Sequence, residues 1–130
     1  MRYEIAFLED GGQVDAAVTL SGPVTPTDFR ELTDALTRDP RWRAGLAMLV
    51  DISALEVAAL SEEDLGELTG PVVARDWDFA PRAVAIVAPD DERFRAAQSY
   101  RAHLGGSRSK RYVVRTRAEA LAWLDAQRPD

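Results

Sequence analysis

Cysteine is absent from this 130-residue chain, which excludes disulfides, thiolate catalysis and cysteine metal sites. No apolar run approaches the roughly 20 residues of a membrane-spanning helix, so we expect no membrane insertion. The chain opens without a cationic and apolar signal segment, and we therefore expect a cytoplasmic location. What is present, 46% hydrophobic residues over 130 positions, is enough for one domain with a sizeable core, and we expect a single domain over residues 1–130.

Residues that could carry catalysis are also scarce. Histidine occurs once, at His103, so a Ser-His-Asp arrangement would have to use it. Neither a nucleophile elbow nor a glycine-rich phosphate loop is present. We therefore expect no enzymatic activity, no cofactor and no resident metal.

Positive charge is concentrated late in the chain. Residues 1–92 carry 7 arginines and 19 acids, whereas residues 93–117 carry 8 basic residues and no acid. A candidate basic patch consists of Arg101, Arg108, Lys110, Arg111 and Arg115. The patch could attract an anionic partner, but a solvated surface that balances acids elsewhere explains it as well. Because the net charge is −6 and no aromatic stacking platform is evident, we expect no binding to nucleic acid.

The apolar pattern predicts an α/β fold. Residues 3–8 and 14–20 read as two strands joined at residues 9–12, where Asp-Gly and Gly-Gly favour a tight hairpin. Continuous apolar runs at 46–53 and 83–88, and a short one at 112–114, predict buried strands. Helices are expected from residue 26 to Asp39-Pro40, from residue 62 to a break or kink at Gly70-Pro71, from the acids after residue 89 to about residue 104, and after Thr116.

This order, ββαβαβαβα, predicts a five-stranded, mostly parallel sheet with an antiparallel edge and packed helices. The buried strand ending Val50-Asp51-Ile52-Ser53, the segment 84–91 and the ending at residues 118–124 resemble the SpoIIAA-like proteins. That family is a bacterial branch of the STAS and CRAL-TRIO (Sec14) superfamily. The resemblance implies the same fold and a non-enzymatic regulatory or protein-interaction role, with a homodimer or another protein as partner.

The resemblance also bears on a phosphorylation switch. In STAS anti-sigma-factor antagonists, a strand ending in Asp is followed by a second acid and a phosphorylatable serine. Asp51 matches the first acid, but Ala59 and Leu60 occupy the next two positions and Ser61 comes one residue late. Ser61 opens a capping box with three acids behind it, where a phosphate would meet like charges. We therefore predict that the switch is absent.

Two groups of residues are candidates for a ligand or an interface. Asp51, Ser53, Asp90 and Asp91 follow two neighbouring buried strands, where open α/β sheets bind ligands. Alternatively, Asp90 or Asp91 caps the next helix and Ser53 closes a turn. Trp77 and Phe79, between the kinked helix and the next strand, belong to the core, a dimer contact or the wall of a pocket. The third possibility, which the Sec14 relationship suggests, makes the protein a binding module for a small apolar or lipid-like ligand.

Overall fold

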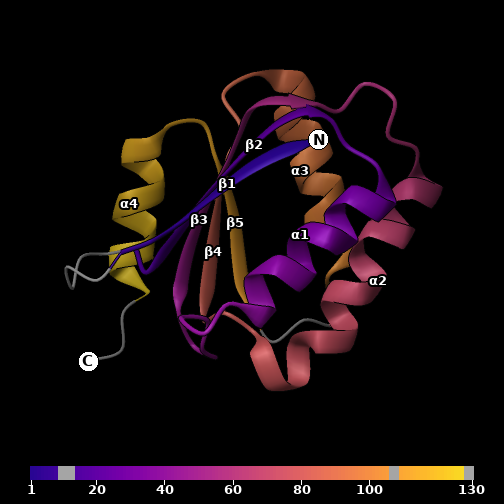
Figure 1. The fold of residues 1–130 in the computed structure, drawn as a ribbon. Coiled ribbons are helices and arrows are strands. Elements are labelled where there is room, and N and C mark those ends of the chain that lie inside the picture. Colours follow the sequence, from indigo (N-terminus) through magenta and orange to yellow (C-terminus); the bar gives the residue numbers. More distant parts are fainter. Residues whose placement is uncertain (9–13, 106–108, 128–130) are drawn as a thin grey trace.

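The chain forms one five-stranded sheet with helices on both faces (Figure 1). The structure is a computed structural model and describes residues 1–8, 14–105 and 109–127, except for the side chains of residues 71 and 75–79. The strands are β1 (Arg2–Phe7), β2 (Ala16–Pro23), β3 (Ala47–Glu56), β4 (Ala83–Val87) and β5 (Lys110–Val114). The helices are α1 (Pro26–Arg38), α2 (Glu62–Phe79), α3 (Asp91–His103) and α4 (Arg117–Ala126).

The sheet has the strand order β1-β2-β3-β4-β5. The pair β1 and β2 is antiparallel, and each later neighbour is parallel. The predicted order of elements and the mostly parallel sheet with an antiparallel edge are confirmed. The hairpin turn expected at residues 9–12 and the loop expected around residues 106–107 lie outside the described residues.

The predicted caps start the helices as expected. The Oγ1 atom of Thr25 accepts the N–H of Asp28 at 3.1 Å, and Thr116 does the same for Glu119 at 3.1 Å. Ser61 and Asp64 form a reciprocal capping box, in which each side chain accepts the other residue's N–H. These local bonds satisfy backbone donors that a helix start leaves unpaired, so they fix the element boundaries.

Three boundaries differ from those expected. Strand β3 extends to Glu56, so Asp51 and Ser53 lie inside the strand and not beyond its end. Strand β2 continues through Pro23, since parallel pairing with β3 extends to Pro23 and Glu56. Helix α2 passes through Gly70-Pro71 without a break and includes residues 77–79, which the sequence analysis places between elements. Proline at this position was expected to break or kink the helix, but its cost of about 3 kcal/mol is offset when the rest of the helix packs.

The two faces of the sheet are covered differently. Helix α4 packs on one face, closely against β4, and α1, α2 and α3 lie over the other (Figure 1). On the α4 face, Ala47, Ala83, Ala85 and Ala120 are buried together with larger residues such as Leu49, Val87 and Leu124. On the other face, the backbones of α1 and α2 approach each other closely but make few close contacts with the sheet among the described residues. Larger side chains of these helices, among them Leu32, Leu36, Leu65 and Leu68, bridge to the strands in one buried cluster.

Candidate functional site

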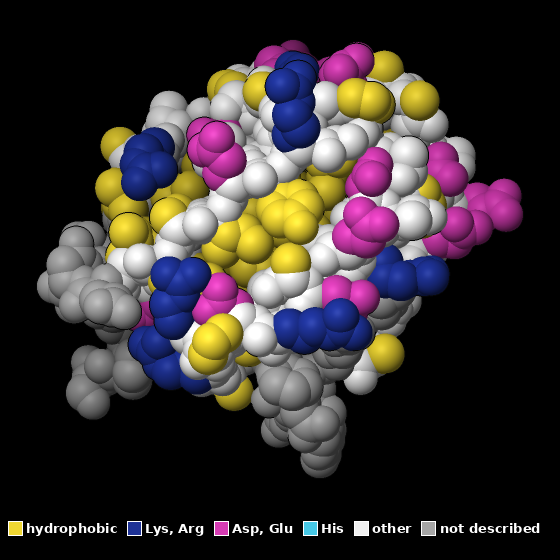
Figure 2. All heavy atoms as spheres, viewed as in Figure 1, with side chains coloured by type: hydrophobic (Ala, Val, Ile, Leu, Met, Phe, Trp, Pro, Cys, Tyr) yellow, Lys and Arg dark blue, Asp and Glu magenta, His cyan; other side chains and the backbone are white. Residues whose placement is uncertain are grey.

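An apolar cavity of about 140 Å³ lies between the sheet and helices α1, α2 and α3. Figure 2 shows hydrophobic side chains at the bottom of a hollow in the centre of this side of the molecule, framed by charged side chains of both signs. An apolar cavity of about 150 Å³ in another protein stays dry and binds benzene. The space is therefore the right size for one small ring or a short aliphatic group.

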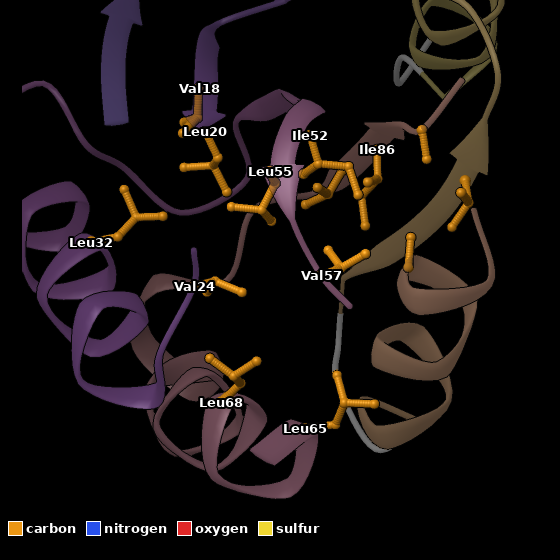
Figure 3. Packing of buried hydrophobic residues seen from close by; sticks show 14 of the residues in the cluster. Val18, Leu20, Val24, Leu32, Ile52, Leu55, Val57, Leu65, Leu68 and Ile86 are labelled. Carbon is orange, nitrogen blue, oxygen red and sulfur yellow. The ribbon is translucent and has the colours of Figure 1, made fainter. Parts of the chain in front are cut away.

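The lining comes from strands and helices far apart in the sequence. In Figure 3, Val18, Leu20, Ile52 and Ile86 from the strands lie opposite Leu32, Leu65 and Leu68 from the helices. The other apolar lining residues include Val24, Phe29, Leu36, Met48, Val50, Leu55, Val57, Leu60, Val72, Val84, Ala96 and Ala97. On β3, Met48, Val50 and Ile52 line the cavity at alternate positions, as the two-residue period of a strand requires, and Leu55 joins them after the register shift between β2 and β3.

Few polar side chains reach this space. Thr33 and Thr37 line it, but their hydroxyls donate to backbone carbonyls one turn earlier, to Phe29 at 3.0 Å and to Thr33 at 2.8 Å. Tyr100 on α3 and Arg111 on β5 also line the cavity. Neither an acidic side chain nor a histidine is among the described lining residues, so the lining offers mostly hydrogen-bond donors.

Tyr100 is held in place by its ring. The ring meets that of Phe29 edge to face, with the centroids 5.6 Å apart and the planes at 65°. Burial raises the pKa of the Tyr100 phenol above its usual value, while the positive charge of Arg111 opposes part of that rise. The phenol is therefore neutral near pH 7 and available as a donor.

Asp51 and Ser53 do not face the cavity. On β3, Asp51 shares the face of Ala47 and Leu49, which pack in the cluster beneath α4, so it points to the opposite side of the sheet from Val50 and Ile52. Its Oδ1 atom accepts the backbone N–H of Ser53 at 2.9 Å and also the Ser53 hydroxyl. These bonds join the two residues within β3, where the register between β2 and β3 shifts.

Asp90 and Asp91 each have a structural partner at the start of α3. Asp90 caps the helix, accepting the N–H of Arg93 at 2.9 Å and its guanidinium at 2.7 Å. Both bonds lower the pKa of Asp90 below its usual value, and the bond from the backbone N–H of Arg93 has the larger effect. Asp91 pairs with Arg115 at 2.8 Å. Asp90 therefore acts as the helix cap that the sequence offered as the alternative to a ligand site. In the described part of the chain, no three acidic or histidine side chains group closely enough to hold a metal ion.

The basic patch is spread over two ends of the sheet. Lys110 begins β5 and Arg115 follows its end, about 16 Å away at the rise of a strand. Arg115 stacks over Phe94, 4.2 Å from the ring centroid, in addition to its bond to Asp91. Arg101 lies over the ring of Tyr112, which stacks on Trp123 with centroids 5.5 Å apart. Arg108 lies outside the described residues, and Arg111 turns toward the cavity.

The remaining candidates are placed only in part. Trp77 and Phe79 belong to the last turn of α2, and their side chains lie outside the described residues, so their place in the core, an interface or a pocket stays a prediction. Leu60, at the position where the resemblance to STAS antagonists would place a switch serine, is half-buried and lines the cavity. Ser61 is engaged as the cap of α2.

The sequence does not single out Tyr100. Its one signal is the helical spacing from Ala97, also a lining residue, which is equally typical of an ordinary core position. The cavity as a whole has no sequence signal, since its aliphatic residues read as core. Only the distance between helices and sheet distinguishes a filled core from a hollow one.

Comparison with known proteins places the fold. No family model matches the chain, and the search of curated proteins yields no match. Among solved structures, the chain is similar to an uncharacterised protein of the DUF3478 family with a SpoIIAA-like fold, from Shewanella loihica PV-4. The TM-score is 0.60 at 20% sequence identity, over 95% of this chain and 96% of that one. No helix in the described part of the chain is long and apolar enough to span a membrane. With the strand order and the pairing observed here, this likeness shows that the chain has a SpoIIAA-like fold.

Proposed function

We propose that the protein is a non-enzymatic binding module for a small apolar molecule, which it holds between the sheet and helices α1, α2 and α3. The observation that carries the proposal is the 140 Å³ cavity with its almost wholly apolar lining. Binding sites for small molecules are concave, mostly apolar, and carry a few placed polar groups. The lining lacks a described carboxylate, histidine or cysteine that could act as a nucleophile or base, which supports binding without catalysis.

The size of the cavity limits the ligand. A space that fits a benzene ring does not hold two acyl chains, so we expect a ring-sized molecule or a short chain and not a membrane phospholipid. Of the two ligand classes expected from the sequence, a small apolar molecule therefore fits the cavity better than a large lipid.

A blocked variant tests the proposal. Toluene is titrated into the protein and followed by calorimetry and by methyl shifts in NMR spectra, with micromolar to millimolar binding expected. Ala97→Phe places an extra ring in the cavity from buried Ala97 and should abolish binding. Ala102→Phe, the same change at an exposed position of the same helix, is the matched control and should bind normally. Absence of binding by the native protein, or equal binding by Ala97→Phe in a folded state, contradicts the proposal.

We also propose a protein-contact role in which a second copy pairs along β1. As the edge strand of the sheet, β1 has a free side in the described part of the chain. Antiparallel pairing about a two-fold axis at Tyr3, which is 39% exposed, would set Arg2 of each copy opposite Glu4 of the other. Light scattering after size exclusion tests this: the native chain should be dimeric, and Tyr3→Pro, which removes an edge donor, should be monomeric. A native monomer at high concentration contradicts it.

A further inference from the structure

The polar groups of the cavity point to one kind of ligand. Four described side chains with hydroxyl or guanidinium groups line it, and the two threonine hydroxyls donate to helix carbonyls. Trp42 also lines the cavity and has an interaction partner of its own, so we consider the Tyr100 hydroxyl and the Arg111 guanidinium as the donors to a guest. In the part of the chain that the structure describes, the Tyr100 hydroxyl has no hydrogen-bond partner. This hydroxyl can therefore donate a hydrogen bond to an acceptor atom of a guest.

The charge of the lining residues further limits the kind of ligand that the cavity would bind. Arg111 is the one cation among the described lining residues, and no described acid lines the cavity beside it. Arg111 also has another interaction partner, but its guanidinium carries five N–H donors and can serve a second acceptor. Tyr100 on α3 and Arg111 on β5 both line the cavity, and these two elements are in contact with each other. A single positive group favours a single negative charge and disfavours an ammonium group.

We propose that the natural ligand is a small amphiphilic carboxylate, with a ring or short chain in the apolar cavity and its carboxylate held by the hydroxyl of Tyr100 and the guanidinium of Arg111. This rests on the proposed binding function and specifies its ligand class. A phosphate ester fits less well, because it carries more charge than one guanidinium balances and adds bulk to a space of about 140 Å³.

Three probes with the same ring separate the possibilities. Toluene is neutral, phenylacetate carries a carboxylate, and benzylammonium carries the opposite charge on a body of similar size. At pH 7 and fixed ionic strength, the native protein should bind phenylacetate at least about tenfold more tightly than benzylammonium, which is the effect of one charge-assisted hydrogen bond.

Two variants locate the effect. Tyr100→Phe keeps the ring and its contact with Phe29, and it should weaken phenylacetate about tenfold while toluene binding stays unchanged. Arg111→Gln should remove the preference for phenylacetate over benzylammonium. Tyr112→Phe and Lys110→Gln are the matched controls, because Tyr112 is exposed and neither residue lines the cavity. Both controls should leave all three affinities within about twofold of the native values.

The outcomes keep the two proposals apart. If toluene binds and phenylacetate binds no better than benzylammonium, the carboxylate proposal is overturned and the binding function stands. If Lys110→Gln reduces phenylacetate binding as much as Arg111→Gln does, the anion is attracted by the basic surface and not held in the cavity, which also overturns it. If none of the three probes binds, both proposals fail.

Discussion

The two faces of the sheet differ in how closely their helices approach it. On the α4 face, alanines at the facing positions let the helix pack directly against β4. On the other face, larger aliphatic side chains project from the strands, and α1 and α2 contact each other more than the sheet. Because protein interiors are normally packed to crystal-like density, we infer a binding role for the face that holds the 140 Å³ apolar cavity. We call the α4 face the closed face, and the opposite face, which holds the cavity, the hollow face.

The largest effect is expected from a cavity made on the closed face. Leu124, on the inner side of α4, is fully buried, and Leu124→Ala should lower the free energy of unfolding by about 2–5 kcal/mol, measured by urea denaturation. Leu121→Ala, at a half-buried position of the same helix, is the control and should cost less. Equal losses for the two variants would contradict the tight packing of this face.

The same small-to-large substitution should change the stability of the protein differently on the two faces of the sheet. Ala85→Leu overfills the closed face and should destabilise the protein by about 1–3 kcal/mol. Ala97→Leu adds the same group toward the cavity and should be neutral or stabilising by about 0.5–2 kcal/mol. Thermal and urea unfolding of both variants make the comparison, and a loss of stability in Ala97→Leu as large as in Ala85→Leu would show that the hollow face is filled.

Removing the cap of α2 should have a smaller effect. Ser61→Ala loses the bond to the N–H of Asp64 and should cost about 1 kcal/mol, whereas Ser61→Asp keeps a capping oxygen and should stay within about 0.5 kcal/mol of the native protein. The matched experiment on the closed face is Thr116→Ala, which removes the equivalent bond at the start of α4. A large change in structure or association in Ser61→Asp would instead favour a phosphorylation switch.

The smallest effect is expected in how the free energy of unfolding changes at acidic pH. The pKa of Asp90 is lowered chiefly by the N–H of Arg93, so its contribution to stability is present above the usual carboxyl pKa and is lost as the pH falls through the lowered value. Asp90→Asn keeps a cap without the charge, and its free energy of unfolding should fall less steeply than the native one between pH 5 and pH 2. The corresponding cap of α4, Thr116, does not titrate. Identical pH profiles for native and Asp90→Asn protein would contradict this.

Local signals in the sequence predict most of the fold. The capping boxes at Thr25 and Ser61 start helices where expected, because they depend on residues only three apart. Boundaries that depend on pairing with another strand were less accurate: β3 extends to Glu56 because β2 continues beside it. The helix through Gly70-Pro71 shows the same limit, since packing outweighs the local preference of proline.

The candidate site was predicted less well than the fold. Asp51 and Ser53 were expected at a ligand-binding edge, but the alternation of β3 turns Asp51 away from the cavity that Val50 and Ile52 line. Arg111 was expected as part of a surface patch and lies on the cavity wall. Strand alternation predicts on which side of β5 the Arg111 side chain lies, but it does not predict that this side borders a cavity.

The sequence by itself determined the order of strands and helices, the caps, the SpoIIAA-like fold and the shortage of catalytic side chains. Periodicity and capping depend on neighbours along the chain, so they can be found without coordinates. Only the tertiary structure decided that one face of the sheet is closed and the other hollow, and that Tyr100 and Arg111 line the same cavity. The physical reason is that a cavity depends on the distance between packed layers, which is set by all the side chains between them and by no single segment.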